Sequence, residues 1–230
     1  MIPEKKYSVI IVAGGKGYRA GGELPKQFLS IGGKPMLMHT IQAFQTYDYR
    51  VRIIVVLPEG YKPLWEQLCD EYQFSVNHII VYGGETRFHS VKNGLQEVSD
   101  EEIVCIHDAA RPFVTSDLIG RCFDESFNNQ CGVIPVIDEV NSVRRITQTG
   151  SEIVDRQELK LIQTPQAFPA EMLKNAYNTK YETSFTDDAS VAEKSGIKIK
   201  LIEGEQSNIK ITTAFDLKLA EFYFQYLSKR

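Results

Sequence analysis

Two segments of this chain carry residues that could bind and activate a triphosphate. Residues 13–19 read Ala-Gly-Gly-Lys-Gly-Tyr-Arg and directly follow a short apolar run at 9–12. Glycines let the backbone approach a phosphate closely, and the amides of such a loop can point at it. Arg19 and Lys26 add two fixed positive charges to the same region, and residues 107–111 read His-Asp-Ala-Ala-Arg after another apolar run. Together these residue types predict a site that binds a triphosphate and stabilises the charge moving on it.

Two familiar phosphate-binding motifs fit the glycine-rich stretch poorly. Residues 17–22 have the glycine spacing of a P-loop, but Glu23 stands where that motif requires a lysine. The spacing at 15–20 resembles a dinucleotide fingerprint, which should be followed about 20 positions later by an acid at the end of the second strand. The next convincing strand, 51–57, ends far beyond that point, and Glu59 is its first acid. This disfavours an NAD-dependent oxidoreductase, the alternative from another class, while a simple glycine turn remains the structural alternative.

Length, charge and composition limit the remaining classes. The 230 residues suffice for one α/β domain, and a hydrophobic share of 43% is typical of a globular protein. The formal net charge of −4 provides no broad basic face, so we expect no nucleic-acid partner. The apolar run near the N-terminus is too short for a signal peptide or a membrane span, so we expect no membrane association and a cytoplasmic protein.

The cysteines and histidines offer no candidate for metal binding or covalent catalysis. The 4 cysteines contain no Cys-x-x-Cys pair and are interpreted as buried thiols. The 4 histidines lack the spacing of metal ligands. No Ser/His/Asp or Cys/His arrangement stands out, so a nucleophilic side chain is not expected to take part in the reaction.

Strand-like and helix-like segments alternate along the chain. Apolar runs that suit buried strands occur at 9–12, 53–56, 79–81, 103–106 and 133–136, with amphipathic segments at 37–44, 65–68 and 91–98. This alternation predicts an α/β fold with right-handed βαβ units and a mostly parallel sheet covered by helices on both faces. Ligands of such sheets bind at the carboxyl ends of the strands. A third candidate segment, Gly-Gly-Glu-Thr-Arg at 83–87, follows one strand, so three strand ends should converge on one crevice.

Residues 138–156 break the alternation and predict a projecting β-arm. Two segments with apolar residues, 143–146 and 152–154, flank Thr149 and Gly150 in the manner of a hairpin. An isolated hairpin is marginally stable and needs a surface to pack on, either a partner subunit or its own domain. The residues leave both alternatives open. No linker or repeat divides the chain, so we expect a single domain over 1–230 with the arm inserted.

The last third of the chain gives weaker signals. Residues 163–166 and 186–190 suit loops or helix starts. Residues 198–202 suit a further parallel strand. The final helix should bury an apolar stripe made of Leu217, Ala220, Phe224 and Leu227.

Short motifs occur in a fixed order over nearly the whole chain. Besides the two opening segments they are Pro-Lys-Gln at 25–27, Gly-Gly-x-x-Arg-x-x-Ser at 83–90, Asp-Arg at 155–156, Gln-Thr-Pro-Gln at 163–166, Thr-Asp-Asp-Ala-Ser at 186–190 and Asn-Ile-Lys at 208–210. In this order they closely resemble the 2-C-methyl-D-erythritol 4-phosphate cytidylyltransferases of the non-mevalonate isoprenoid pathway. The resemblance implies a Rossmann-like nucleotidyltransferase fold, a homodimer with interlocked arms that makes 138–156 a dimerisation arm, and CTP with Mg²⁺ as cosubstrates.

The resemblance also assigns roles to individual residues. Arg19 and Lys26 match the family's transition-state stabilisers, and Arg156 and Lys210 match the pair that positions the sugar phosphate. The nucleotide-binding positions correspond to Ala13, Gly14, Gly15, Gly17, Gly84, Glu85, Ser90 and Asp108. The positions lining the polyol-phosphate site correspond to Ala109, Arg111, Ser142, Thr164 and Thr186, where Ser142 stands for the family's threonine. No direct protein ligand for Mg²⁺ is implied, since the ion is expected on the triphosphate, with Asp108 as the alternative contact.

Three of these assignments have structural alternatives. Arg111 and Asp108 could form a salt bridge that fixes their loop. Thr186 could cap the helix that follows it, a role that is compatible with substrate binding.

The implied chemistry agrees with the missing nucleophile and base. A phosphate monoester has a second pKa of about 6, so at neutral pH it is already an oxyanion that can attack the α-phosphate of CTP in line. Cations must bring the two anions together, and pyrophosphate leaves. Ribitol 5-phosphate cytidylyltransferase is the near alternative. Ala110, the segment 186–190 and Asp155-Arg156 favour the methylerythritol substrate.

Overall fold

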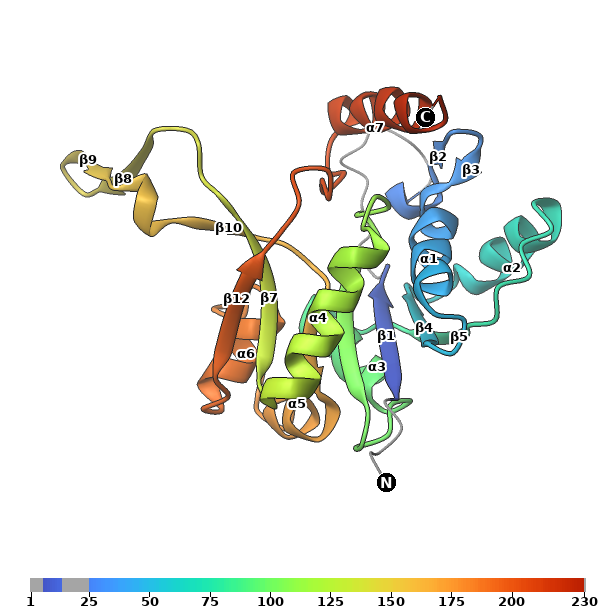
Figure 1. The fold of residues 1–230 in the computed structure, drawn as a ribbon, viewed down its shortest axis with the longest axis horizontal. Helices are drawn as coiled ribbons and strands as arrows, with labels where there is room; N and C mark the ends of the chain where they lie inside the picture. The colour runs from blue at the N-terminus through green and yellow to red at the C-terminus, as the bar shows by residue number, and fades with distance from the viewer. Residues whose placement is uncertain (1–5, 14–24, 230) are drawn as a thin grey trace.

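The computed structural model describes residues 6–13 and 25–229 of the chain. In that part of the chain, an eight-stranded sheet runs in the order β10-β7-β11-β6-β1-β4-β5, and β12 pairs with β7 (Figure 1). Its strands are β1 (Tyr7–Val12), β4 (Arg52–Leu57), β5 (Ile79–Tyr82), β6 (Ile103–Asp108), β7 (Gly132–Asp138), β10 (Lys160–Ile162), β11 (Gln166–Pro169) and β12 (Ile199–Glu203). The β6-β1-β4-β5 run and the β12-β7 pair are parallel, so the predicted α/β fold with a mostly parallel sheet is confirmed.

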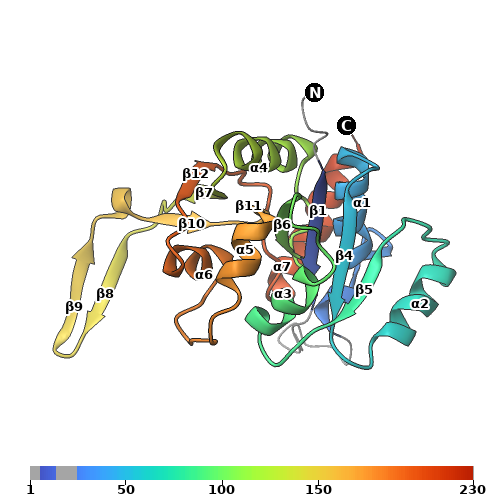
Figure 2. The same cartoon turned by 90° about the horizontal axis from the view of Figure 1, so that it is seen from below.

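Helices cover both faces of this sheet because side chains of each strand alternate between them (Figure 2). Val9 and Ile11 of β1 belong to the core under α1 (Met36–Tyr47), α2 (Lys62–Glu71) and α4 (Ser116–Asn129). Ile10 faces the other core, under α3 (Arg87–Leu95), α5 (Ala170–Ala176) and α6 (Asp188–Lys194). These three β1 side chains are fully buried. The continuous apolar runs of the sequence therefore reflect strands that are covered on both sides.

One strand of the sheet is not where the sequence predicts it. Residues 163–166, expected to be a loop or helix start, lead into β11, which runs antiparallel between β6 and β7. The sequence pattern does not predict this strand because its first residue, Gln166, is polar, although Gln166 is fully buried in the structure. Its amide donates to Asp187 Oδ2 at 2.9 Å and its carbonyl oxygen accepts from the backbone N of Ala189 at 3.0 Å. These hydrogen bonds satisfy the buried amide and tie β11 to the start of α6.

The C-terminal helix α7 (Ala214–Leu227) lies at the end of the sheet toward which β1 points (Figure 1). It contacts the small hairpin formed by β2 (Ser30–Ile31) and β3 (Lys34–Pro35), where Glu221 accepts from the backbone N of Gly32 at 3.0 Å. The predicted apolar stripe is only partly buried. Ala220 is fully buried and Leu217 and Phe224 pack beside it, but Leu227 is 43% exposed.

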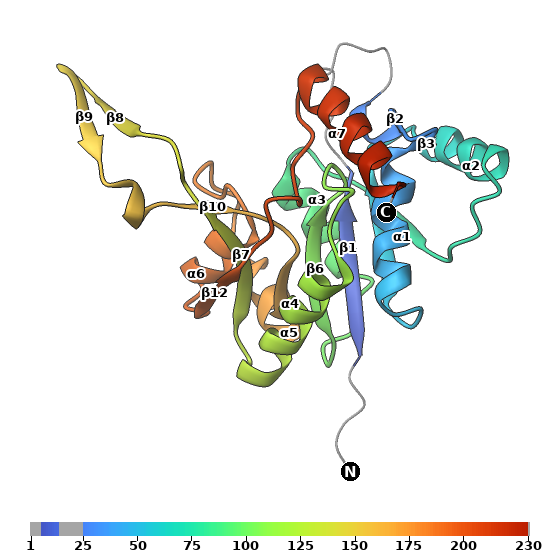
Figure 3. The same cartoon turned by 45° about the horizontal axis from the view of Figure 1, so that its top comes forward.

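Residues Val143–Thr147 (β8) and Gly150–Val154 (β9) form an antiparallel hairpin that pairs with no strand of the large sheet. It projects well away from the helices and the sheet (Figure 3). Its register places Ile146 and Ile153 on the same face, and each is 81% exposed. Arg145 and Glu152 pair on the opposite face with 2.7 Å between Nη1 and Oε1. Ile146 and Ile153 thus form an exposed apolar patch on a face that also carries Arg144 and Ser151, while Val143 and Val154 share the other face with the charged pair.

Candidate active site

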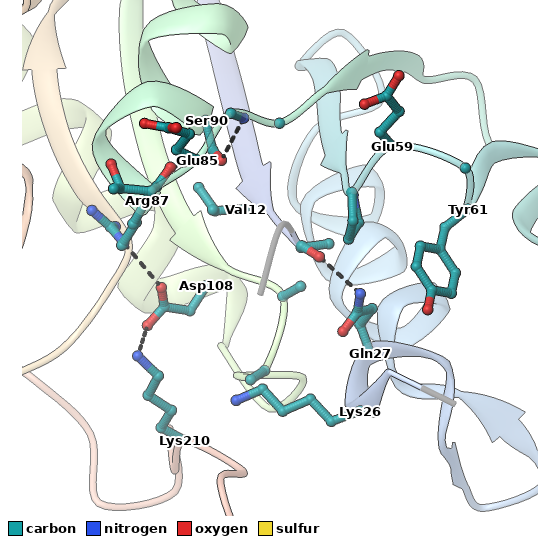
Figure 4. A pocket seen from close by; sticks show the side chains of 18 residues that line it. Val12, Lys26, Gln27, Glu59, Tyr61, Glu85, Arg87, Ser90, Asp108 and Lys210 are labelled. Atoms are coloured by element: carbon teal, nitrogen blue, oxygen red, sulfur yellow. Dashed lines mark hydrogen bonds and ion pairs between the residues drawn. The ribbon is translucent and has the colours of Figure 1, made fainter. Parts of the chain in front are cut away.

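The carboxyl ends of β1, β4, β5 and β6 open into one cavity of about 1270 Å³ (Figure 4). The cavity is lined by Val12, Ala13, Lys26, Gln27, Pro58, Glu59, Gly60, Tyr61, Gly83, Gly84, Glu85, Thr86, Arg87, Ser90, Asp108, Ala109, Ala110 and Lys210. The three strand ends expected from the sequence do converge here. The fourth, the segment Pro58–Tyr61 after β4, was missed because it carries no motif.

The loop after β5 presents its backbone to the cavity. A Cβ atom at Gly84 would collide with the Cβ of His89, so this position accepts only glycine without rearrangement. Ser90 lies beneath the loop, accepting from the backbone N of Gly84 at 3.2 Å and donating to the carbonyl oxygen of Thr86 at 2.9 Å. The Ser90 hydroxyl therefore holds the shape of the loop, while the side chain of Glu85 is exposed at the cavity.

Asp108, at the end of β6, is the carboxylate on which the cavity's cations converge. Lys210 Nζ lies 2.7 Å from its Oδ2, Arg111 Nε lies 3.7 Å from the same oxygen, and Arg87 Nε lies 3.7 Å from Oδ1. Burial alone would raise the pKa of Asp108, but the positive charges of Arg87, Lys210 and Arg111 outweigh it and hold that pKa well below its ordinary value. Asp108 is thus a fixed negative charge.

A fourth cation, Lys26, approaches from the same side of the cavity as Lys210 (Figure 4). Its Nζ donates to the backbone carbonyl of Ile211, the residue after Lys210, at 3.1 Å. Its neighbour Gln27 is buried and donates from Nε2 to the carbonyl oxygen of Ala13 at 2.8 Å. This contact joins the 3-10 helix Lys26–Phe28 to the end of β1.

Thr164 and Arg111 lie beneath the cavity floor instead of lining it. Both are buried, and Arg111 Nη1 donates to the carbonyl oxygen of Asn208 at 2.7 Å. Thr164 Oγ1 accepts from the backbone N of Asp108 at 3.0 Å and lies 3.1 Å from His107 Nδ1. The alternative in which Arg111 fixes its loop is consistent with these contacts.

His107 is the buried centre of this network. Its Nε2 lies 3.1 Å from the carbonyl oxygen of Arg111, which can only accept, so Nε2 carries the proton and Nδ1 accepts from Thr164. Burial lowers the pKa of His107 to about 4, so the ring is neutral at pH 7. A neutral imidazole that receives and donates one hydrogen bond connects Thr164 to the loop at Arg111.

Several candidate residues lie elsewhere. Ser142 and Arg156 are exposed at the base of the β-arm, where Arg156 Nη1 donates to the carbonyl oxygen of Val140 at 2.6 Å, and neither lines the cavity. Thr186 is exposed and does not cap α6, because the cap is Asp187, whose Oδ1 accepts from the backbone N of Ser190 at 2.9 Å. Gly14, Gly15, Gly17 and Arg19 lie outside the described residues.

Arg87 is the functional candidate that the sequence analysis left without a role. It lines the cavity and reaches Asp108, and its signal was its place in the Gly-Gly-x-x-Arg-x-x-Ser motif directly after a strand.

The described residues do not form a protein cage for a divalent cation. Residues 6–13 and 25–229 contain no group of three or more histidine, cysteine or acidic side chains arranged around a common point. Asp108 is the central carboxylate of the cavity, and each of its oxygens already faces a cation. The residues present therefore do not favour Asp108 as a direct metal ligand.

Comparison with known proteins agrees with the geometry. The family model of the 2-C-methyl-D-erythritol 4-phosphate cytidylyltransferases (IspD) matches residues 7–226. The chain is 55% identical to the cytidylyltransferase of that name from Bacteroides thetaiotaomicron, over 93% of this chain and 97% of the relative. A similarly named protein from Porphyromonas gingivalis is 44% identical over 95% and 97% of the two chains.

Solved structures match the whole fold. The 4-diphosphocytidyl-2C-methyl-D-erythritol synthase from Anaerococcus prevotii superposes with a TM-score of 0.81 at 27% identity, covering 96% of each chain. The 2-C-methyl-D-erythritol 4-phosphate cytidylyltransferase from Thermus thermophilus gives a TM-score of 0.76 at 28% identity, covering 96% of this chain and 99% of the other. In the described part of the chain, no helix is both long and apolar enough to cross a membrane.

Proposed function

This chain belongs to the 2-C-methyl-D-erythritol 4-phosphate cytidylyltransferase family, and we propose how its residues carry out that family's reaction. The enzyme transfers CMP from CTP to 2-C-methyl-D-erythritol 4-phosphate, which yields 4-diphosphocytidyl-2-C-methyl-D-erythritol and pyrophosphate for isoprenoid biosynthesis. Family membership removes the oxidoreductase alternative. This assignment is supported by two lysines that line one cavity built by four strand ends: Lys210 pairs with Asp108, and Lys26 contacts the residue after Lys210.

The reaction needs charge neutralisation more than proton transfer. With a second pKa of about 6, the phosphate of the polyol substrate is an oxyanion at neutral pH and needs no general base. Its oxygen forms a bond to the α-phosphorus of CTP while the bond from that phosphorus to the bridging oxygen breaks, and pyrophosphate leaves with the electron pair. The His107 ring is neutral and buried among hydrogen-bonding partners, which is consistent with a structural role.

The cations are proposed to neutralise different charges, according to where they lie in the site. Lys26 and Arg19 are proposed to stabilise the negative charge that builds up on the α-phosphate in the transition state. Lys210 is proposed to hold the attacking phosphate, together with Arg156. Because Lys210 Nζ lies 2.7 Å from Asp108 Oδ2, its N–H donors are divided between this carboxylate and the substrate phosphate when the substrate binds.

The base and the ribose are assigned to the strand ends after β1, β5 and β6. Backbone groups of Ala13, Gly14 and Gly84 are proposed to read the cytosine, supported by the Ser90 contact that fixes the loop, with Glu85 beside them. The glycines Gly15 and Gly17 would approach the triphosphate. Asp108 and Ala109 are proposed to form the floor under the ribose and the polyol, with Thr164 and Arg111 below it, and Thr186 is proposed to contact the polyol phosphate from outside the cavity lining.

Mg²⁺ is proposed to arrive on the triphosphate oxygens, which are hard ligands of the kind it prefers. Asp108 is not proposed as its ligand, because the cations around Asp108 already neutralise that carboxylate.

We further propose that the β-arm, residues 138–156, joins two copies of the chain into a homodimer. Ile146 and Ile153 form an exposed apolar patch that a second copy would bury, and an isologous contact would bury it in both subunits at once. Ser142 and Arg156 lie at the base of the arm and outside the cavity of their own chain. Arg156 would then complete the site of the partner subunit.

The deciding experiment measures pyrophosphate release from CTP with each polyol phosphate offered separately. Release with 2-C-methyl-D-erythritol 4-phosphate and little with ribitol 5-phosphate is expected. UTP in place of CTP serves as the control for base recognition. Preferential use of ribitol 5-phosphate would replace the proposed substrate by the alternative, and no release with either would refute the proposed activity.

A further inference from the structure

Arg87 connects two carboxylates that come from different parts of the chain. It is the first residue of α3, and its guanidinium extends along the wall of the cavity toward Asp108 (Figure 4). Its Nη2 donates to Asp188 Oδ2 at 2.6 Å, and its Nε lies 3.7 Å from Asp108 Oδ1. The reaction steps described above assign no role to this side chain.

Asp188 is the rigid end of this arrangement. It is fully buried at the start of α6, and its second oxygen accepts a hydrogen bond from the hydroxyl of Tyr177 at 2.7 Å. Tyr177 is itself buried and stacks on Phe88 with ring centroids 4.7 Å apart. A buried carboxylate needs a paired charge, and Arg87 supplies it. The guanidinium is therefore anchored on the side away from the cavity.

Four side chains thus form a row of alternating charge, in the order Asp188, Arg87, Asp108 and Lys210. Arg87 faces one oxygen of Asp108 and Lys210 faces the other, which fixes how the Asp108 carboxylate is rotated. Arg87 also neutralises part of the negative charge of Asp108. Without Arg87, only Lys210 and Arg111 would neutralise that charge. Removing Arg87 would leave Lys210 more tightly paired with Asp108.

We propose that Arg87, anchored by Asp188, is a positioning residue that orients Asp108 and leaves Lys210 available to the attacking phosphate. The inference rests on the proposed function, in which Lys210 holds that phosphate. Arg87 itself need not touch either substrate, because its effect passes through Asp108. It follows that the contribution of Arg87 should depend on the charge of Asp108.

A double-mutant cycle tests this dependence. Arg87→Gln is made in the wild type and in Asp108→Asn, and kcat and both KM values are measured. In the wild type, Arg87→Gln should raise the KM for the polyol phosphate on the order of tenfold, with a smaller change in the KM for CTP. In the Asp108→Asn background the same substitution should change the KM for the polyol phosphate by less than about threefold. An equal fold-change in the two backgrounds would overturn the proposal.

Two further variants distinguish the positioning role from a general loss of positive charge and from a failure to fold. Arg52→Gln removes one positive charge at an exposed pair with Glu97, away from the cavity, and should leave both KM values unchanged. Arg87→Lys keeps a cation near Asp188 but lacks the fork that faces two carboxylates, and it replaces Arg87→Gln if that variant does not fold. With Arg87→Lys too, a change in the KM for the polyol phosphate that is equal in the wild-type and Asp108→Asn backgrounds refutes the positioning role.

The result is distinguishable from a failure of the proposed function. Wild-type pyrophosphate release with each polyol phosphate decides the function alone. The cycle is then measured with whichever polyol phosphate the wild type accepts. A KM change for that substrate that depends on the residue at position 108 supports the positioning role of Arg87. The same KM change in both backgrounds, measured with folded variants, refutes that role.

Discussion

The buried histidine under the active site makes stability depend on pH in a defined direction. His107 is fully buried, and its ring nitrogens are engaged by Thr164 and by the carbonyl oxygen of Arg111. Burial lowers its pKa from the ordinary value of 6.5 to about 4 in the folded chain. The neighbouring charges of Asp108, Arg111 and Lys210 change this pKa less than burial does. Lowering the pH from 7 to 5 is the perturbation.

The sign and the size follow from proton linkage. Between pH 6.5 and pH 4 the unfolded chain has a protonated His107 while the folded chain does not, so the free energy of unfolding falls as the pH falls. With these two pKa values, His107 contributes a loss of about 2 kcal/mol between pH 7 and pH 5. The full loss below pH 4 is about 3 kcal/mol.

Urea unfolding at a series of pH values, for the wild type and for His107→Gln, measures this contribution. Glutamine can donate and accept hydrogen bonds but does not titrate, so the variant should be less stable at pH 7 yet lose about 2 kcal/mol less than the wild type by pH 5. His39 and His78 also have lowered pKa values, and they cancel because both proteins contain them. Parallel curves for the two proteins between pH 7 and pH 5 would refute the burial argument.

Three further predictions concern catalysis, assembly and packing. Lys26→Ala and Arg19→Ala should each lower kcat at least on the order of 10²-fold in the pyrophosphate assay, and a raised KM for CTP with normal kcat would mean that they only hold the ground state. Inactive Arg156→Ala and Lys26→Ala chains should recover up to about half the activity per heterodimer after mixing, and no recovery after verified subunit exchange would contradict a site shared between subunits. Gly132→Ala should cost about 1–3 kcal/mol of unfolding free energy in urea titrations, because its Cβ would lie 2.6 Å from the buried ring of Phe168, and unchanged stability would contradict that packing.

The sequence predicts the parallel part of the sheet well because strands that are buried on both faces are continuous runs of apolar residues. The runs at 53–56, 79–81, 103–106 and 133–136 all lie inside strands of the structure. The βαβ connections place the carboxyl ends of these parallel strands at the same edge of the sheet. Three of the strand ends that form the cavity could therefore be predicted from the sequence. The hairpin at residues 143–154 was also predictable, since apolar residues flank a turn glycine and no helix period competes.

The remaining features depend on contacts between distant residues. β11 was missed because Gln166 interrupts its apolar pattern, and only the contacts to Asp187 and Ala189 make that amide acceptable inside the protein. The alternative in which Thr186 caps α6 put the cap one residue too early, because threonine and aspartate are both good caps. Sequence spacing cannot show that Arg87 meets Asp188, which lies 101 positions away.

The network around Asp108 gives a physical reason for His107, Asp108 and Arg111 in the 107–111 segment. Asp108 contributes the charge, His107 supports Thr164 beneath it, and Arg111 fastens the loop to Asn208. The backbone N of Asp108 is therefore held by Thr164, and its carboxylate is held by three cations. Each of these three cations therefore faces a carboxylate before substrates bind. In the proposed reaction the arriving phosphate competes with this carboxylate for the N–H donors of Lys210, and the row through Arg87 to Asp188 is proposed to keep Asp108 in place while the phosphate binds.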